Sequence, residues 1–361
     1  MMNILVIHAT AGAGHKKAAE AIFNELQRTP HHVRIADALD YTHPFFKKSY
    51  VFAYVFLVTK LPWLWQFFFG LLDIPALWPL VRWVRRVYNG TNAGALEKFL
   101  TTEQFDVIIC THFLAAEVLA YLKRAGRIRA RVICAVTDFD VHRIWVNEGI
   151  DVYAVACDYT RDKMLALGVP ATKISVTGIP IDGKFSESYD IGALQRKLGL
   201  REGLLTILIA TGSFGMGPIA ALIGLLKDHQ LIVVCGHNKI LFEDLKGRAG
   251  KDTHVMGLVD NMPELMAVAD VLVTKPGGLS IAEALARKLP MIFFSAIPGQ
   301  ETGNIRVLKT YGVGRGQCAP QEIVRIIDDW SSSPRILRRL KDDLAILSKP
   351  NAAADIVRLI T

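Results

Sequence analysis

Short apolar runs of strand length alternate with longer helix-like stretches along almost the whole chain. In the first half the apolar runs cover residues 2–8, 33–37, 106–111, 131–137, 152–156 and 174–177, and in the second half they cover 204–211, 231–235, 270–274 and 291–294. Repeated alternation of strands and helices predicts parallel sheets with helices on both faces. The pattern therefore indicates an α/β protein with doubly wound sheets.

One polar stretch interrupts this alternation near the middle of the chain. A Gly-Ile-Pro-Ile turn at 178–181 leads into DGKFSESYD, and the second set of apolar runs begins after it. The chain has 361 residues, which is enough for two domains with a core each. We predict two Rossmann-like domains that face each other across a cleft, residues 1–182 and 183–345, followed by a C-terminal helix within 346–361 that packs back on the first domain.

The first apolar run ends in a glycine turn that precedes a helix. The turn reads Gly-Ala-Gly-His at 12–15, and the apolar residues from Ala19 to Leu26 repeat at helical spacing. A strand, a glycine turn and a helix in this order form a phosphate cradle in many proteins. The Walker signature is absent because His15 follows Gly14, and the dinucleotide signature is absent because Lys17 replaces its third glycine. The turn instead presents the imidazole of His15 at a helix start.

A second strand, glycine turn and helix lie at DVLVTKPGGLSIAEALARKLP, residues 270–290. Gly277 and Gly278 allow backbone N–H groups to turn toward an anion, and the dipole of the following helix favours a diphosphate there. Ser280 adds a hydroxyl and is expected to cap the helix. Glu283 lies one turn further on, where its carboxylate can accept hydrogen bonds from a ribose diol.

Two more loops of the second half carry polar or glycine-rich sequences after strands. Residues 296–308, AIPGQETGNIRVL, bring Gln300, Glu301 and Asn304 together as candidates for binding hexose hydroxyls, although an ordinary solvated loop has a similar composition. Residues 210–219, ATGSFGMGPI, again place glycines after a strand. Because ligands of doubly wound domains bind at the carboxyl ends of the strands, these loops together predict one nucleotide-sugar site.

Residues 44–90 break the alternation with an aromatic and basic composition. They contain fourteen of the 32 aromatic residues of the chain, and six Lys or Arg against one Asp. The longest stretch without charge, 61–72, is shorter than the about 20 apolar residues that a membrane span needs. We predict an interfacial element that inserts Trp and Phe at the acyl boundary and places Lys and Arg on anionic headgroups. The alternative is a buried helical hairpin.

The net charge of +8 is compatible with nucleic acid, an anionic membrane or an anionic small molecule. Nucleic acid is not favoured, because the basic residues of 44–90 cluster with Trp and Phe in an apolar stretch. The five cysteines are scattered without a Cys-x-x-Cys pair, which argues against a zinc site or a disulfide framework and suits a reducing compartment. The N-terminus runs straight into a strand, so no cleavable signal peptide is expected.

Five of these stretches resemble one family of enzymes. They are Gly-Ala-Gly-His at 12–15, TDFDVHRIWV at 137–146, TGIPI at 177–181, KPGGLSIAEAL at 275–285 and PGQETGN at 298–304. The chain resembles the diacylglycerol glycosyltransferases, which include plant-type monogalactosyldiacylglycerol synthases and bacterial processive diacylglycerol glucosyltransferases of glycosyltransferase family 28. More distantly it is similar to the peptidoglycan enzyme that adds N-acetylglucosamine to lipid I.

This resemblance implies the GT-B fold and a membrane-associated enzyme that moves a hexose from UDP-glucose or UDP-galactose to diacylglycerol with inversion. It implies a donor site in the second domain, with the diphosphate, ribose, hexose and uracil each held by its own loop. The implied donor-binding residues are Gly277, Gly278 and Ser280 for the diphosphate, Glu283 for the ribose, Gln300 and Glu301 for the hexose, Gly257 and Leu258 for the uracil, and Gly212 and Ser213 over the phosphates. Asn304 is a further donor-binding candidate from the polar sequence of 296–308 itself.

The same resemblance turns His15 toward the acceptor in the first domain. A base must take the proton of the acceptor hydroxyl, and a histidine whose pKa is lowered by a helix start stays neutral for this task. His15 is therefore a candidate base, with helix capping or headgroup binding as the alternative, and Asp138 at a strand end is the second candidate. The remaining candidates for acceptor binding are Gly14, His112, His142, Trp63 and Trp65.

Asp138-Phe139-Asp140 matches the Asp-x-Asp metal motif of the other main glycosyltransferase fold. It lies in the half opposite to the predicted donor loops, so we expect no metal and no cofactor besides the UDP-sugar. We expect a peripheral protein on the cytoplasmic face of a membrane, with anionic lipids as partners. Two alternatives remain open: transfer of N-acetylglucosamine to a polyprenyl-linked acceptor, and a non-catalytic sensor of nucleotide sugars.

Overall fold

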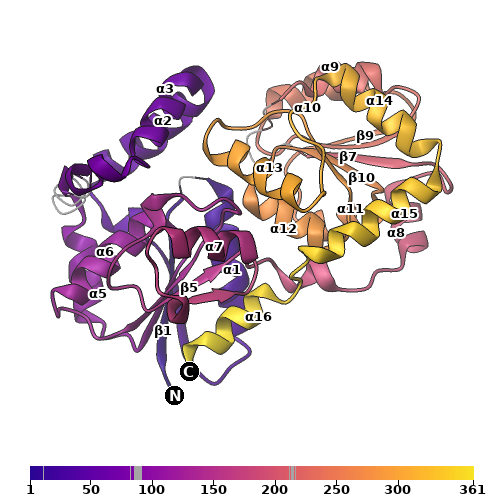
Figure 1. The fold of residues 1–361 in the computed structure, drawn as a ribbon. Helices are drawn as coiled ribbons and strands as arrows, with labels where there is room; N and C mark the ends of the chain where they lie inside the picture. The colour runs from indigo at the N-terminus through magenta and orange to yellow at the C-terminus, as the bar shows by residue number, and fades with distance from the viewer. Residues whose placement is uncertain (11, 82, 85–91, 211, 213–214, 216) are drawn as a thin grey trace. The chain divides into compact units, whose positions relative to one another are not determined.

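A computed structural model describes the whole chain except residues 11, 82, 85–91, 211, 213–214 and 216 (Figure 1). The chain forms two compact units. The first unit comprises Met1–Gly183, Ile297–Gly303 and Asn351–Thr361, and the second comprises Lys184–Ala296 and Asn304–Pro350. The main division thus falls next to the predicted one, whereas the short segment Ile297–Gly303 groups with the first unit although it lies within the predicted second domain.

The first unit contains a six-stranded parallel sheet with the order β2-β1-β3-β4-β5-β6. Because the strand order reverses between β1 and β3, the carboxyl ends of these two strands form the topological switch point where doubly wound sheets bind ligands. The strands are β1 (Asn3–His8), β2 (His32–Asp37), β3 (Val107–Cys110), β4 (Arg131–Ala135), β5 (Val152–Val155) and β6 (Ile174–Val176).

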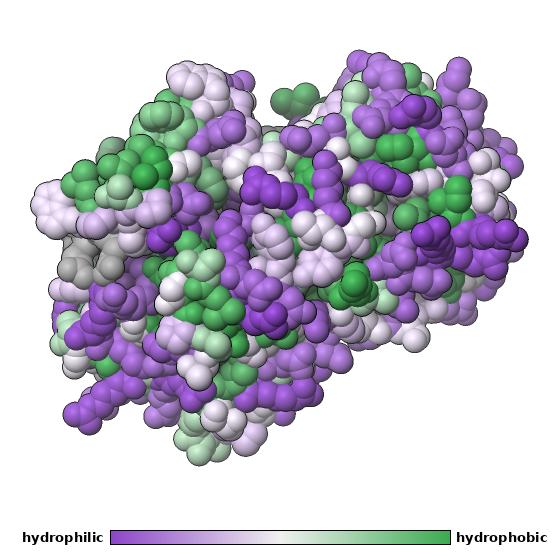
Figure 2. All heavy atoms as spheres, viewed as in Figure 1, coloured by the Kyte–Doolittle hydropathy of each residue, from purple (hydrophilic) through white to green (hydrophobic). Residues whose placement is uncertain are grey.

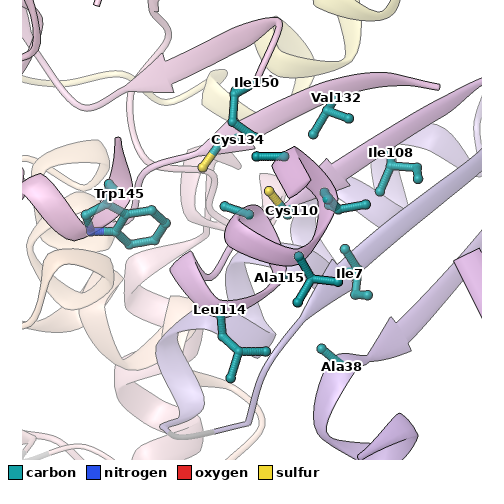
Figure 3. Packing of buried hydrophobic residues seen from close by; sticks show 14 of the residues in the cluster. Ile7, Ala38, Ile108, Cys110, Leu114, Ala115, Val132, Cys134, Trp145 and Ile150 are labelled. Carbon is teal, nitrogen blue, oxygen red and sulfur yellow. The ribbon is translucent and has the colours of Figure 1, made fainter. Parts of the chain in front are cut away.

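Helices cover both faces of this sheet, as the alternation of the sequence predicts. The side chains of β1 alternate between two buried clusters: Val6 packs with Ile22 of α1 and Ile356 of α16, and Ile7 packs with Leu114 and Ala115 of α6 (Figure 3). The C-terminal segment therefore buries apolar side chains against the first unit. The helices are α1 (Ala13–Leu26), α2 (Pro44–Lys60), α3 (Pro62–Leu71), α5 (Gly94–Thr102), α6 (Phe113–Arg124), α7 (Asp158–Ala166) and α16 (Ala352–Val357).

The second unit contains a five-stranded parallel sheet with the order β11-β10-β7-β8-β9. Its switch point lies between β7 and β10. The strands are β7 (Thr206–Ala210), β8 (Gln230–Val234), β9 (Thr253–Met256), β10 (Val271–Thr274) and β11 (Met291–Phe293). The helices are α8 (Ile191–Leu198), α9 (Ile219–Leu225), α10 (Lys239–Arg248), α11 (Met262–Val268), α12 (Gly278–Ala286), α13 (Gln300–Thr310), α14 (Pro320–Ser331) and α15 (Pro334–Asp343).

Seven short 3₁₀ helices are described between these elements. Of these, η3 follows β4 and forms part of the candidate site. They are η1 (Ala38–Tyr41), η2 (Pro75–Leu77), η3 (Arg143–Trp145), η4 (Ala171–Lys173), η5 (Gly183–Ser186), η6 (Leu344–Ile346) and η7 (Arg358–Ile360).

The described part of the aromatic segment forms α2 and α3, which lie outside the helix layers of the sheet in Figure 1. Within the described residues no single helix is long and apolar enough to cross a membrane. Taken together, α2 and α3 reach that length and hydropathy, but the chain bends by 114° between them. We refer to Pro44–Leu71 as the aromatic hairpin.

Candidate active site

The switch point of the first unit brings together the start of α1 and the residues that follow β3. Gly14 and His15 lie in the first turn of α1, and Thr111 and His112 directly follow β3. The hydroxyl of Thr111 donates to the carbonyl oxygen of His15 at 2.8 Å. This hydrogen bond ties the two chain segments together across the switch point.

The hydrogen bonds of the His15 ring define which tautomer it adopts when neutral. Its Nδ1 lies 2.7 Å from the carbonyl oxygen of Thr111 and 3.0 Å from the hydroxyl of Thr137. Because a carbonyl oxygen accepts and never donates, Nδ1 carries the hydrogen and Nε2 carries the lone pair. The helix start is Gly12, which has no side-chain cap, so the alternative in which His15 caps its own helix is wrong.

The pKa of His15 lies below its ordinary value, at about 4. Burial of the ring is the largest cause, the hydrogen bond to Thr111 opposes it, and the nearby His8 adds to the lowering. The sequence predicts the same direction, but from the helix start, whereas the structure shows that desolvation dominates. At neutral pH the ring is therefore uncharged and Nε2 is available as an acceptor.

Asp138 lies three residues beyond the end of β4 and is 8% exposed. Its two carboxylate oxygens each face a donor: Nε1 of Trp145 lies 3.3 Å from Oδ2, and Nε2 of Gln300 lies 3.4 Å from Oδ1. Burial raises the pKa of Asp138 to about 6; the two hydrogen bonds lower it, and the carboxylates of Glu301 and Asp140 raise it. The group therefore changes protonation state close to neutral pH.

Asp140, the second carboxylate of the Asp-x-Asp sequence, has a cation as its partner. Its Oδ1 lies 2.5 Å from Nζ of Lys163, and its side chain is 7% exposed. A Cβ atom on Gly303 would lie 2.7 Å from Oδ2 of Asp140, so that position needs glycine. Among the described residues no group of three or more His, Cys, Asp or Glu side chains could hold a metal ion.

His112 and His142 each cap the start of a helix, and their predicted role in acceptor binding stays a prediction. Nδ1 of His112 accepts from the N–H of Leu114 at 3.1 Å and so caps α6, and its ring packs edge-on against His15 at 4.5 Å between centroids. Nδ1 of His142 accepts from the N–H of Ile144 at 3.1 Å and so caps η3. Both side chains are buried.

The aromatic hairpin exposes one side and packs with the other. Phe46 is the one buried residue of α2, and α3 contains none, so the alternative of a buried hairpin is wrong for the described residues. Apolar side chains gather over α2 and α3 in Figure 2. The exposed aromatic residues of the two helices are Phe45 (75%), Phe52 (70%), Phe56 (43%), Trp63 (66%), Phe67 (60%) and Phe68 (46%).

The two predicted acceptor-binding tryptophans have different surroundings. Trp63 is 66% exposed, whereas Trp65 packs edge-on against Tyr54 and stacks on Phe69. The Nε1 atom of Trp65 is buried and has no hydrogen-bond partner within the described residues. A buried donor without a partner costs about 1–3 kcal/mol, which a ligand oxygen would offset. Trp65 therefore remains a candidate for acceptor binding, and Trp63 fits a lipid surface.

In the second unit, the β10–α12 turn and the β7 loop meet at the switch point. Gly277 is the N-cap of α12 with φ −69° and ψ 137°, and no side chain caps the helix. The expected capping by Ser280 is therefore wrong, because Ser280 lies in the first turn itself. The first N–H groups of α12 thus have no side-chain acceptor at this cap, which suits a diphosphate.

Other predicted donor residues follow neighbouring strands of the second sheet. Gly212 follows β7 with φ +73°, a conformation that favours glycine, and Ser213 lies outside the described residues. Gly257 and Leu258 follow β9; a Cβ on Gly257 would meet no atom within 4 Å, and Leu258 is 64% exposed. Glu283 is partly buried on α12. These residues share the carboxyl edge of one sheet.

The first turns of α13 carry the predicted hexose ligands, and each of these side chains has a partner within the protein. Asn304 is fully buried, and its side-chain amide donates to the carbonyl oxygen of Pro276 at 3.0 Å, so it braces the glycine turn of α12. Glu301, in the first turn of α13, accepts from the N–H of Ile297 at 2.7 Å and so ties the start of the helix to the preceding loop. Gln300 and Glu301 belong to the segment that groups with the first unit, where Gln300 meets Asp138.

Sequence reasoning missed four residues that shape this site. Thr111 and Thr137 hold the ring of His15, Trp145 donates to Asp138, and Lys163 pairs with Asp140. The position of Thr111 and Thr137 as the last residues of two predominantly apolar runs was the available signal, because polar residues at strand ends face the switch point.

Two family models match the chain, one in each half. The model described as monogalactosyldiacylglycerol (MGDG) synthase matches residues 15–181. The model described as glycosyltransferase family 28 C-terminal domain matches residues 206–303. The first match lies within the first compact unit, and the second covers all five strands of the second sheet together with the segment Ile297–Gly303 of the first unit.

Relatives match over nearly the full length. A processive diacylglycerol beta-glucosyltransferase from a strain of Bacillus cereus is 30% identical over 364 residues, which cover 99% of this chain and 90% of the relative. The protein of the same name from Bacillus subtilis (strain 168) is 29% identical over 361 residues, covering 97% and 92%.

Solved structures agree on the fold. MurG of Acinetobacter baumannii has a TM-score of 0.60 at 13% identity and covers 100% of this chain and 99% of that one. HepE of Anabaena in complex with UDP-glucose has a TM-score of 0.60 at 16% identity, with coverage of 100% and 98%. These likenesses show the GT-B fold, in agreement with the prediction from the sequence.

Proposed function

We propose that this chain, which belongs to the diacylglycerol glycosyltransferase family, moves a hexose from a UDP-sugar to the hydroxyl of diacylglycerol with inversion at the anomeric carbon. The observation that carries the proposal is the pair of switch points, each matched by its own family model. One presents a histidine lone pair and a buried carboxylate, and the other presents the uncapped start of a helix.

Glucose is the donor hexose that we favour. The relatives that match along nearly the whole chain are named beta-glucosyltransferases. A single displacement on the α-anomer of UDP-glucose gives a β-glucoside. Galactose differs in the orientation of one hydroxyl, so UDP-galactose is the first competitor to test.

The second unit would bind the UDP moiety at the switch point between β7 and β10. The first N–H groups of α12 and the positive end of its helix dipole would face a diphosphate there. The hydroxyl of Ser280 lies in the same turn. Glu283, on the next turn of the helix, would accept from the ribose hydroxyls. As the bond to the sugar breaks, the same helix start stabilises the charge that develops on the leaving diphosphate.

The first unit would bind the lipid acceptor. The exposed aromatic rings of the hairpin would enter the acyl boundary of a membrane, and Lys47, Lys48 and Lys60 would meet anionic headgroups. Arg82, Arg85 and Arg86 of the predicted basic cluster lie outside the described residues. The protein would then be peripheral, on the cytoplasmic face, where its five free cysteines stay reduced.

Asp138 suits the role of general base better than His15 does. A general base works best when its pKa is near the operating pH. The pKa of Asp138 is about 6, whereas that of His15 is about 4, which makes the imidazole the weaker base. Asp138 would therefore take the proton of the acceptor hydroxyl, and Nε2 of His15 would accept a hydrogen bond that orients the acceptor.

The reaction would proceed without a metal ion. Asp140 is paired with Lys163, which leaves the Asp-x-Asp sequence without a free pair of carboxylates. The charge of the leaving group is met in this scheme by the start of α12. Loss of activity in EDTA that manganese restores would contradict this part of the proposal.

The test is transfer by the purified full chain in EDTA to vesicles of diacylglycerol and, separately, to vesicles of a polyprenyl-linked lipid, with labelled UDP-glucose, UDP-galactose and UDP-N-acetylglucosamine in parallel. A labelled β-glucosyl lipid supports the proposal, and a labelled galactolipid changes the donor while keeping the reaction. An α-linked product overturns the inverting mechanism. Transfer of N-acetylglucosamine to a polyprenyl lipid alone, or UDP binding with no transfer at all, overturns diacylglycerol as the acceptor.

A further inference from the structure

The end of α3 is held by the loop that carries Asp138. The carbonyl oxygen of Phe69 lies 3.0 Å from Nε2 of His142, and the two rings pack at 4.1 Å between centroids, tilted by 37°. Because Nδ1 of His142 accepts from the N–H of Ile144, the hydrogen of the neutral ring is on Nε2 and is donated to Phe69. His142 therefore caps two elements at once, the end of α3 and the start of η3.

A second contact runs parallel to the first. Oδ1 of Asp73, two residues beyond α3, accepts from the N–H of Arg143 at 3.3 Å. The same oxygen lies 4.0 Å from Nε of Arg143 and 3.8 Å from Nε2 of His142. Nε of Arg143 is buried and has no hydrogen-bond partner within the described residues, so this ion pair is incomplete in the observed arrangement.

The other end of η3 reaches the carboxylate. Trp145, which is 1% exposed, is the last residue of η3 and donates from Nε1 to Oδ2 of Asp138. A continuous series of contacts therefore joins the exposed aromatic hairpin to Asp138, through Phe69, His142 and Trp145. Buried contacts of this kind transmit displacement because packed side chains have few alternative arrangements.

The loop that leads into Gln300, the first residue of α13, packs on the same phenylalanine. A Cβ on Gly299 would lie 2.7 Å from Cδ1 of Phe69, and Gly299 has φ +83°, so this position needs glycine both for conformation and for space. Gln300 is the second donor to Asp138. Both hydrogen-bond donors of the carboxylate are therefore connected to Phe69. Trp145 is connected through His142, and Gln300 is connected through Gly299.

We propose that His142 is a positioning residue that couples docking of the aromatic hairpin on a lipid surface to the orientation of Asp138. The inference rests on the proposed function. When α3 is held by lipid, the Phe69–His142 contact fixes η3, and Trp145 then holds the carboxylate toward the acceptor hydroxyl. Without lipid, α3 lacks that further restraint, and a shift of α3 would carry the two donors of Asp138 with it.

Two substitutions separate the capping contacts of His142. In His142→Asn the side-chain oxygen can still accept from the N–H of Ile144 and cap η3, but the side chain is too short to reach Phe69. In His142→Gln the longer side chain can still donate to the carbonyl of Phe69. His32→Asn is the matched control, because it removes an exposed histidine on β2, away from this site.

The readout is kcat/KM for a long-chain diacylglycerol in vesicles and for a short-chain, monomeric diacylglycerol, together with the pH profile. Wild-type protein is expected to be at least tenfold more active on vesicles, and His142→Asn to lose most of that ratio while KM for the UDP-sugar stays within twofold. His142→Gln is expected to recover at least a third of it. The acid limb of the pH profile is expected to move down in His142→Asn, since a loosened carboxylate becomes hydrated.

Three outcomes have distinct meanings. If His142→Asn keeps the wild-type ratio and pH profile, the coupling is overturned while the proposed function stands. If His142→Asn and His142→Gln lose activity equally on both acceptors with no shift of the acid limb, His142 is structural and the coupling is also overturned. Absence of transfer by the wild-type protein to either acceptor overturns the proposed function itself.

Discussion

The carbonyl oxygen of Thr111 lies 2.7 Å from Nδ1 of His15, and this contact determines which nitrogen of the ring carries the hydrogen. The hydroxyl of the same threonine donates to the carbonyl oxygen of His15 at 2.8 Å. The turn after β3 therefore holds both the backbone and the ring of His15, in the first turn of α1. Nε2 is left with its lone pair, at the switch point where an acceptor would bind.

Substitution of His15 tests whether Nε2 contributes to the reaction. His15→Asn can still donate an amide hydrogen to Thr111 but lacks Nε2, so we expect a loss in kcat of roughly 10–100-fold with little change in thermal stability. His15→Phe loses Nε2 and also the hydrogen bond from the ring to the carbonyl of Thr111, so it is expected to lower the melting temperature as well. The measurements are initial rates and thermal unfolding. Full activity in His15→Asn would show that the ring serves the fold alone.

The pH dependence of kcat/KM distinguishes the two candidate bases. A base acts when deprotonated, so activity falls as the pH drops below the pKa of the base in the free enzyme. We expect a tenfold fall per pH unit below about 6 if Asp138 is the base, and no such fall until about 4 if it is His15. Asp138→Asn is expected to lower kcat by roughly 10²–10⁴-fold and to remove the acid limb. An acid limb near pH 4 in the wild type would reassign the base to His15.

The fold and both switch points could be predicted from the sequence because they depend on local patterns. Apolar runs such as 107–110 and 271–274 are buried wherever a parallel sheet places them, and a glycine turn after a strand lies at its carboxyl end. The apolar pattern predicts less accurately the residue at which a strand ends. The run 131–137 predicts a longer strand than β4, which ends at Ala135, and Asp138 then lies beyond the sheet edge.

The contacts within the site could not be predicted, because they join residues far apart in the chain. Thr111 and His15 are separated by 96 positions, and Gln300 and Asp138 by 162. A loop between a strand and a helix of the second half is naturally assigned to the second domain. The packing of Gly299 on Phe69, which groups 297–303 with the first unit, depends on shape and not on any sequence pattern.

Glu283 provides a direct test of the donor site. We expect Glu283→Ala to weaken binding of UDP by roughly 10–100-fold, because a charge-assisted hydrogen bond contributes about 1.5–3 kcal/mol. Isothermal titration calorimetry with UDP and with uridine diphosphate sugars measures this loss. Glu243→Ala, at an exposed position on α10, is the matched control and should bind as the wild type does. Unchanged affinity for UDP in Glu283→Ala would show that Glu283 does not bind the ribose.

The exposed rings of α3 predict how the protein partitions to lipid. Trp63 and Phe67 are 66% and 60% exposed and lie one helical turn apart, so both can enter an acyl boundary together. Replacing both with serine is expected to remove about 2 kcal/mol of lipid binding, which is about a 30-fold fall in the partition coefficient measured by vesicle sedimentation. The folded chain should be no less stable, because neither ring is buried in the fold. The control pair, Ile240→Ser with Ile346→Ser, removes comparably exposed apolar side chains from the second unit and should leave partitioning unchanged. A partition coefficient that falls equally in both double variants would mean that the hairpin has no special affinity for lipid, whereas a fall confined to Trp63 and Phe67 identifies α3 as the surface that meets the membrane.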